Sequence, residues 1–399
     1  MHFKGILCCS AAMVTLCLAP ANAAVINLVD QGGVTGSAAE QGFNIAAAYW
    51  GSILTNSVTI NLGVSFAALN PGIIGSTGSR RLDYSVANWE NQINATKSNS
   101  TLDQNIVLPT LTGGGASFIT NGVDEDGNDD TSKLTYIDGD STSSQVLYLN
   151  SSVVKAIGGN LSSPGALDGT VRFSSNFAFD FNPSDGITAN TFDFIGVAIH
   201  EIGHALGFVS GVDFLDYYGG PDGPGAGALG YSLNDTSIYS ALDMFRYSDD
   251  PTGIAPGTGA TLDLAVGGTK YFSIDGGQTA LFGNTMSTGS YNGDGRQASH
   301  WKDTAGCQVG NGLLDPTFCF GQEGVVTALD LAAYDAMGWN LSVDALANGG
   351  SYLATTGDIY QQFAPAIPEP ATWAMMLAGF GMIGGSMRRR KIRTTVSFA

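Results

Sequence analysis

Positive charge and histidine are both scarce in this chain of 399 residues. Lys and Arg number 16 against 35 Asp and Glu, which gives a formal net charge of −19 at pH 7. Residues 24–366 alone carry 10 basic and 34 acidic side chains, a net charge of −24. A chain so poor in positive charge is excluded from the proteins that bind nucleic acid, because contacts to phosphates depend on basic residues.

Histidine occurs four times, and two of the four lie in the phrase His200-Glu201-Ile202-Gly203-His204. Random placement of the histidines and glutamates would produce about 0.0006 such matches, so the phrase is not an accident of composition. Residues four apart lie on one face of a helix, where His200 and His204 can bind one metal ion. Glu201 can accept a proton from an attacking water and pass it to a leaving amine. The motif predicts metal-assisted hydrolysis of an amide, with Zn2+ as the cofactor.

The third zinc ligand is missing from its usual place. A catalytic zinc site has three protein ligands, and the extended motif puts the third one three residues after Gly207. That position is Ser210, whose hydroxyl is a poor zinc ligand. Asp213 and Asp216 are close in sequence, whereas His300 is distant but is the one histidine left outside the N-terminal segment. We predict His300 as the third ligand, with Asp213 as the alternative.

The segment around the motif has the composition of a buried helix. Residues 192–207 are apolar on nearly every side, as in a helix at the centre of a domain. Asp193 is suited to cap its first turn and Gly207 to end it. Farther on, the glycine-rich residues 219–228 predict an irregular loop of the kind that forms lids or binding sites. Residues 242–248 predict a short buried element.

The motif with its continuation to Phe208, followed far downstream by His300-Trp301, resembles the leishmanolysin-type branch of the metzincin metalloproteases. In that branch an inserted segment displaces the third histidine from the helix, and this histidine sits in a similar His-Trp phrase. The resemblance implies a zinc endopeptidase in which His200, His204 and His300 hold the metal.

Three further segments carry the same resemblance. Residues 312–316 are similar to the methionine turn beneath the metal, with Leu314 at the methionine position, and residues 328–339 are similar to the final helix. Residues 169–175 are similar to the strand at the cleft edge, where a peptide can add as an extra strand; an ordinary sheet strand would show the same alternation. The implied fold is α+β and metzincin-like, with a twisted mixed sheet, a buried catalytic helix and a loop-rich C-terminal half across the cleft.

The N-terminus has the pattern of a secretory signal. Lys4 precedes an apolar run over residues 5–19, and residues 21–23 read Ala-Asn-Ala, the small-x-small pattern of a cleavage site. We predict a signal peptide over residues 1–23, cleavage before Ala24, and secretion.

Loss of that segment would remove three of the five cysteines and leave Cys307 and Cys319. Two cysteines in an oxidising compartment are expected to pair. A bridge between them would close a loop that contains Leu314, and it would contribute about 3 kcal/mol through the entropy of loop closure.

The C-terminus combines three features in a fixed order. Residues 368–370 read Pro-Glu-Pro, residues 371–387 are largely apolar, and residues 388–391 are all basic. This arrangement resembles the PEP-CTERM sorting signal of Gram-negative bacteria. It implies handling by exosortase-type machinery, transient membrane insertion through residues 367–393, and delivery to the envelope, the extracellular matrix or the medium. A permanent single-span anchor is the alternative.

The residues between the two signals, 24–366, are enough for one catalytic unit. We expect its N-terminal half to end near residue 207 and its C-terminal half to cover about 208–345. An acidic loop at residues 124–130 is a candidate Ca2+ site through its side-chain oxygens. It lacks the EF-hand pattern, because Thr135 stands where a bidentate glutamate belongs, and a solvated acidic turn is the alternative.

Together these features predict a secreted zinc-dependent endopeptidase that acts on proteins or peptides. The alternative is a surface or matrix binding protein that keeps a structural zinc site and has no hydrolytic activity. Glu201 distinguishes the two, because a structural site needs no acid between its ligands. The cleavage preference, the natural substrate and the group that stabilises the oxyanion are not predicted by the sequence.

Overall fold

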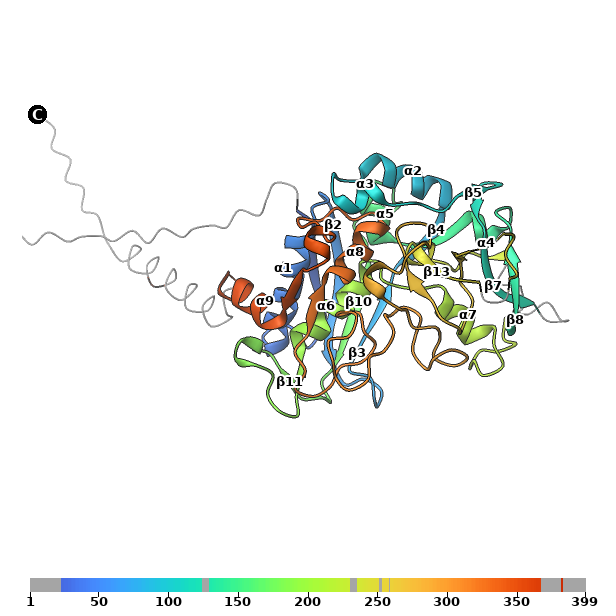
Figure 1. Ribbon diagram of the computed structural model, residues 1–399. Coiled ribbons are helices and arrows are strands. Elements are labelled where there is room, and N and C mark those ends of the chain that lie inside the picture. The colour runs from blue at the N-terminus through green and yellow to red at the C-terminus, as the bar shows by residue number, and fades with distance from the viewer. Residues whose placement is uncertain are drawn as a thin grey trace, which may run out of the picture.

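The computed structural model describes residues 23–123, 129–229, 235–250, 253–257 and 259–366, together with Met382. The chain is a mixture of helices and several small sheets, which confirms the predicted α+β class (Figure 1). The predicted signal peptide, nearly all of the predicted sorting segment and most of the candidate calcium loop lie outside the described residues.

A four-stranded sheet stands next to the helix that carries the motif. Its strands, in spatial order, are β1 (Val25–Gly32), β2 (Thr59–Ala67), β10 (Gly169–Ser174) and β3 (Gly75–Ser79). β2 pairs in parallel with β1 and with β10, whereas β3 runs antiparallel to β10. The sheet is therefore mixed, as predicted.

The edge strand of this sheet near the motif helix is β3. The prediction that residues 169–175 form the edge strand was wrong. Most of that segment is β10, which lies inside the sheet between β2 and β3. β10 buries alternate residues such as Val171 and Phe173, so its sequence shows a strand pattern. β3 reads Gly-Ser-Thr-Gly-Ser and has no hydrophobic alternation that would have revealed it.

The motif helix is α6 (Phe194–Ala205), and all 12 of its residues are buried. The Asp193 carboxylate accepts a hydrogen bond from the backbone N–H of Gly196 at 3.0 Å, which confirms the predicted N-cap. Gly207 adopts φ +130° just beyond the last turn, so it ends the helix as predicted.

Helix α1 (Ala38–Ile53) packs beside α6 and holds it against the sheet. The indole N–H of Trp50 donates to a backbone carbonyl of α6 at 3.0 Å. The Phe43 ring makes edge-to-face contacts with Phe173 of β10 and Phe194 of α6, with centroids 5.0 and 5.1 Å apart. These contacts fix the position of the helix that carries the histidines.

Helix α8 (Ala328–Met337) coincides with the helix predicted over residues 328–339, and all of its residues are buried. A capping box joins Thr327 and Asp330 at its start, and Gly338 ends it with φ +114°. Both ends of the helix are therefore set by local sequence.

Short elements make up the rest of the described chain. The remaining helices are α2 (Val86–Thr96), α3 (Thr101–Asn105), α4 (Thr142–Gln145), α5 (Ser151–Ala156), α7 (Val212–Tyr218) and α9 (Thr356–Phe363). The remaining strands pair as β4 (Arg81–Ser85) with β9 (Val146–Asn150), β5 (Leu111–Thr112) with β6 (Gly115–Ala116), β7 (Phe118–Val123) with β8 (Asp129–Ile137), β11 (Phe179–Asp180) with β12 (Phe192–Asp193), β13 (Arg246–Ser248) with β14 (Thr261–Leu262) and β15 (Tyr271–Phe272), and β16 (Val325–Thr327) with β17 (Leu353–Thr355).

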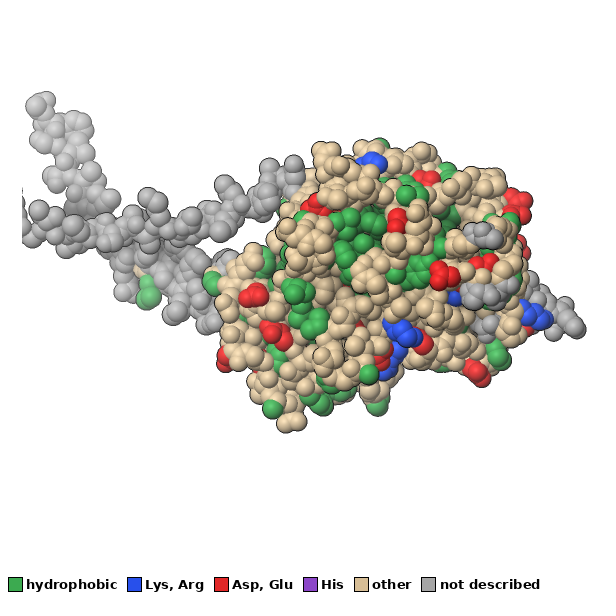
Figure 2. Space-filling view, in the orientation of Figure 1, with side chains coloured by type: hydrophobic (Ala, Val, Ile, Leu, Met, Phe, Trp, Pro, Cys, Tyr) green, Lys and Arg blue, Asp and Glu red, His purple; other side chains and the backbone are tan. Residues whose placement is uncertain are grey.

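The part of the chain beyond α7 is rich in loops, as predicted. Between α7 and β16 the described strands are only two or three residues long. Residues 242–248 form a buried 3-10 turn followed by β13, which confirms the short buried element, and residues 219–228 are irregular. Figure 2 shows one face of the molecule, on which charged side chains lie scattered among neutral surface.

Candidate metal centre

The three histidines of the predicted site lie together. The Nε2 atoms of His200 and His204 are 3.0 Å apart, and the Nε2 atom of His300 is 3.3 Å from the first and 3.2 Å from the second. All three side chains are buried. The chain thus brings a residue 96 positions beyond His204 into contact with both histidines of α6.

The outer nitrogen of each imidazole lies next to a backbone carbonyl. The Nδ1 atom of His200 is 2.8 Å from the oxygen of Leu313, and that of His204 is 2.6 Å from the oxygen of Phe208. For His300 the partner is its near neighbour Gln297, at 3.3 Å. A carbonyl oxygen only accepts, so Nδ1 carries the proton in each ring and Nε2 carries a lone pair.

Three lone pairs that converge in this way are a donor set for a cation. Nitrogen ligands around a tetrahedral zinc ion, each about 2.0–2.1 Å from the metal, lie about 3.3 Å from one another. The observed separations of 3.0–3.3 Å match that spacing. Without a cation the three lone pairs would repel one another in a buried place. The residues present therefore fit a zinc ion with three imidazole ligands.

Burial keeps these imidazoles neutral. Desolvation lowers the pKa of His200 to about 3 and that of His204 to about 4. The pKa of His300 also lies well below its usual value, again because burial disfavours the charged ring. Neutral imidazole is the form that binds metals.

Glu201 lies in the same cleft and contacts the edge strand β3. Its Oε2 atom accepts a hydrogen bond from the Thr77 hydroxyl at 2.7 Å. Burial raises the pKa of Glu201 to about 7, and this hydrogen bond opposes the rise. A side chain at Gly75 would bring a Cβ atom to 2.8 Å from the Glu201 Oε1 atom, so glycine leaves room for the carboxylate. Sequence reasoning missed both β3 residues, since neither belongs to a motif.

The histidines and Glu201 open into a cavity of about 420 Å³. Its lining includes the segment 72–77, which contains the start of β3, together with Asp315, Pro316 and Phe318. A second cavity of about 320 Å³ adjoins it and shares Gln297, His300 and Pro316 as lining residues. The cavity lining thus joins the start of β3 to the three histidines and Glu201.

Asp213, the alternative third ligand, does not join the three imidazoles. Its carboxylate accepts hydrogen bonds from the backbone N–H groups of Ala298 and Ser299, at 2.5 and 3.2 Å. Asp216 likewise accepts from the backbone of Tyr291 at 2.9 Å. Among the described residues, the group with metal-binding geometry consists of the three histidines alone.

The residues predicted to lie beneath the metal contact both parts of the site. Leu313 accepts the hydrogen bond from His200, and the oxygen of Leu314 accepts one from the backbone N–H of Trp301 at 3.0 Å. Asp330 on α8 accepts from the Leu313 and Leu314 backbone and from the Trp301 indole. Sequence reasoning missed Asp330, although the Thr-x-x-Asp pattern before α8 could have indicated its capping role.

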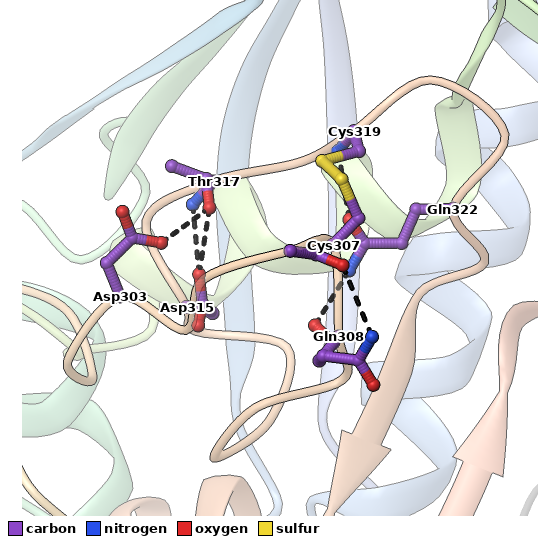
Figure 3. The surroundings of a disulfide bond; sticks show 8 residues. Asp303, Cys307, Gln308, Asp315, Thr317, Cys319 and Gln322 are labelled. Atoms are coloured by element: carbon purple, nitrogen blue, oxygen red, sulfur yellow. Dashed lines mark hydrogen bonds between the residues drawn. A yellow bond between two sulfur atoms is a disulfide. The ribbon is translucent and has the colours of Figure 1, made fainter.

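The predicted disulfide is present and crosslinks this segment (Figure 3). Cys307 and Cys319 are 12 residues apart in sequence, with Cα atoms 5.6 Å apart. Inside the bridged loop, the Thr317 hydroxyl donates to Asp303 at 2.7 Å and also contacts Asp315. The bridge therefore closes the loop that contributes Asp315, Pro316 and Phe318 to the cavity lining.

Comparisons with known proteins identify the tail of the chain. Residues 366–391 match the PEP-CTERM protein-sorting motif, which confirms that resemblance. The motif implies recognition by exosortase-type machinery and a secreted or envelope location in a Gram-negative bacterium. Neither the search of curated proteins nor the search of solved structures found a match. In the part of the chain that the structure describes, no helix is long and apolar enough to cross a membrane.

Proposed function

We propose that this chain is a secreted zinc-dependent endopeptidase of metzincin-like architecture, with His200, His204 and His300 as the zinc ligands and Glu201 as general base and acid. The observation that carries the proposal is the convergence of three buried Nε2 atoms beside a carboxylate in one open cleft. A structural zinc site would need neither the open cleft nor the carboxylate.

Zinc bound at the three imidazoles would supply a Lewis acid that polarises a substrate carbonyl and lowers the pKa of water. Glu201 would accept the proton of the attacking water and then deliver it to the leaving nitrogen of the peptide bond. Burial raises the pKa of Glu201 to about 7 in the metal-free site, which favours proton uptake by the carboxylate, and a bound cation would lower this pKa. Thr77 would hold the carboxylate in one orientation through their hydrogen bond.

The edge strand supports a peptide as the substrate. β3 pairs with β10 on one side, and among the described residues no strand pairs with its other side. Its free backbone N–H and C=O groups could bind an extended peptide as an additional strand. Thr77 of the same strand bonds to Glu201, and Gly75 leaves room for its carboxylate, so a peptide bound there would pass beside that carboxylate.

Three features support the metzincin-like form of the proposal. The third histidine follows a long insertion, the segment with Leu313 and Leu314 underlies the histidines, and an antiparallel edge strand borders the cleft. Leu314 replaces the usual methionine with another buried apolar side chain.

The test is the substitution Glu201→Gln in the full chain, assayed beside wild type and His300→Ala. Gln keeps an oxygen for the Thr77 hydroxyl but cannot take a proton. We expect it to retain zinc, measured by elemental analysis, and to lose about 10²–10⁴-fold in hydrolysis of a quenched-fluorescence peptide library. Retained activity in the Gln variant would refute the role of Glu201. Zinc-loaded wild type that cleaves no peptide would favour a structural zinc site.

A further inference from the structure

We propose that Ser299, Ser210 and the aspartates Asp213 and Asp243 form a hydrogen-bonded support that positions His300 for the metal. The proposal rests on the metal site of the proposed function, and it concerns how the third ligand reaches its place. These four residues are positioning residues, since their side chains bond to one another and to the backbone near His300 and not to the converging nitrogens.

His300 needs such a support because its own anchor is weak. His200 and His204 sit on a buried helix, and their Nδ1 atoms lie 2.8 and 2.6 Å from carbonyl oxygens. His300 lies in a loop, and its Nδ1 contact to Gln297 is longer, at 3.3 Å. The backbone around His300 must therefore be held by other contacts.

Asp213 of α7 holds the two residues that precede His300. One carboxylate oxygen accepts from the N–H of Ala298 at 2.5 Å, and the other accepts from the N–H of Ser299 at 3.2 Å and from its hydroxyl. A carboxylate that takes three hydrogen bonds from two consecutive residues fixes both the path and the rotation of the chain there. Asp213, considered above as an alternative ligand, therefore holds the backbone that leads to the proposed ligand His300.

Ser210 connects this anchor to the end of the catalytic helix. Its backbone N–H donates to the Ser299 hydroxyl oxygen at 2.8 Å, and its own hydroxyl donates to Asp243 at 2.5 Å. Asp243 also accepts from the N–H groups of Gly211 and Ser240, each at 2.8 Å. Ser210 occupies the sequence position where the extended motif has its third ligand. In this chain that position connects the loop that carries His300 to the segment that follows α6.

All the groups in this chain of bonds are buried or half-buried, so each lost partner would leave a polar atom unpaired. Removal of the groups that orient a metal ligand typically costs 10–100-fold in metal affinity or activity. Replacement of a residue in this support should therefore lower metal affinity more than it lowers the stability of the fold.

The experiment measures zinc affinity of the full chain by chelator competition for wild type, Ser299→Ala and Ser299→Thr. We expect Ser299→Ala to weaken zinc binding about 10–100-fold and Ser299→Thr, which keeps a hydroxyl, to restore most of it. The matched control is Ser248→Ala, which breaks another buried Ser–Asp hydrogen bond, to Asp263 at 2.5 Å. It should lower the melting temperature comparably and leave zinc affinity unchanged.

Cobalt in place of zinc separates positioning from ligand loss. At saturating Co2+, Ser299→Ala should give the wild-type visible spectrum, because all three imidazoles still bind, whereas His300→Ala should give a different one. Equal zinc affinity in Ser299→Ala and wild type would overturn the proposal, as would an equal loss in Ser248→Ala. If Ser299→Ala does not fold, Ser210→Ala gives a second test, since it removes the hydroxyl that bonds to Asp243 and to the Val212 N–H and keeps the backbone bond to Ser299. Failure of wild type to bind zinc would instead refute the proposed function.

Discussion

Substitution of Asp330 by Asn should both destabilise the fold and weaken zinc binding at the proposed site. The Asp330 side chain is fully buried and accepts four hydrogen bonds from N–H groups. Its Oδ1 atom accepts from the Trp301 indole at 2.8 Å and the Leu314 N–H at 3.2 Å. Its Oδ2 atom accepts from the N–H groups of Leu313 and Thr327, both at 2.8 Å. All these partners donate, so the site suits an acceptor with two oxygens.

The magnitude follows from this geometry. In either orientation of the Asn amide, its NH2 group would face at least two donors and leave them without an acceptor. Each buried unpaired donor costs about 1–3 kcal/mol, a total of about 2–6 kcal/mol. Burial raises the pKa of Asp330, so removal of the charge returns part of this cost. We expect a net loss of about 2–4 kcal/mol in the free energy of unfolding. Because Leu313 also accepts from His200, zinc affinity should fall as well.

The assay is urea denaturation of the zinc-free and zinc-loaded chain, followed by tryptophan fluorescence. Asp358→Asn is the matched control, because Asp358 accepts a bond from the capping Thr355 hydroxyl at 3.0 Å but is exposed at the start of α9. Its effect should stay within about 0.5 kcal/mol. An Asp330→Asn chain as stable as the control, with unchanged zinc affinity, would refute the reasoning.

Three further predictions concern Glu201, a buried aspartate and the disulfide. Thr77→Val should lower kcat about 10-fold with zinc content unchanged, and Thr77→Ser should keep the wild-type rate, because only the hydroxyl holds the Glu201 carboxylate; equal rates in both variants would contradict this role. Burial and a neighbouring carboxylate raise the pKa of Asp335 to about 8, so the folded state disfavours its ionisation and stability should fall as pH rises from about 4 to about 8. Asp335→Asn should therefore raise the free energy of unfolding by about 2–4 kcal/mol at pH 8 and leave it unchanged at pH 4. Parallel curves of unfolding free energy against pH for the wild type and the variant would show the reasoning to be wrong. Replacement of Cys307 and Cys319 by Ser should lower the free energy of unfolding, measured by urea denaturation, by about 3 kcal/mol and weaken zinc binding. A variant that keeps wild-type zinc affinity would show that the bridge does not support the site.

Local sequence determined the parts of this protein whose partners are near in the chain. The buried helix, its Asp193 cap and its Gly207 stop could be predicted, because periodicity and capping act over a few residues. The pairing of Cys307 with Cys319 followed from the cysteine count, and the sorting tail from its resemblance to PEP-CTERM signals.

Only the tertiary structure decided which distant residues complete the site. His300 and Asp213 were both open as third ligands, and the fold places the His300 imidazole beside those of His200 and His204 and the Asp213 carboxylate on the backbone of Ala298 and Ser299. β3 became the cleft edge although its Gly-Ser-Thr-Gly-Ser sequence shows no strand periodicity. The physical reason is common to both: these contacts join segments far apart in the chain through loops without periodic pattern, so their geometry depends on packing of the whole domain.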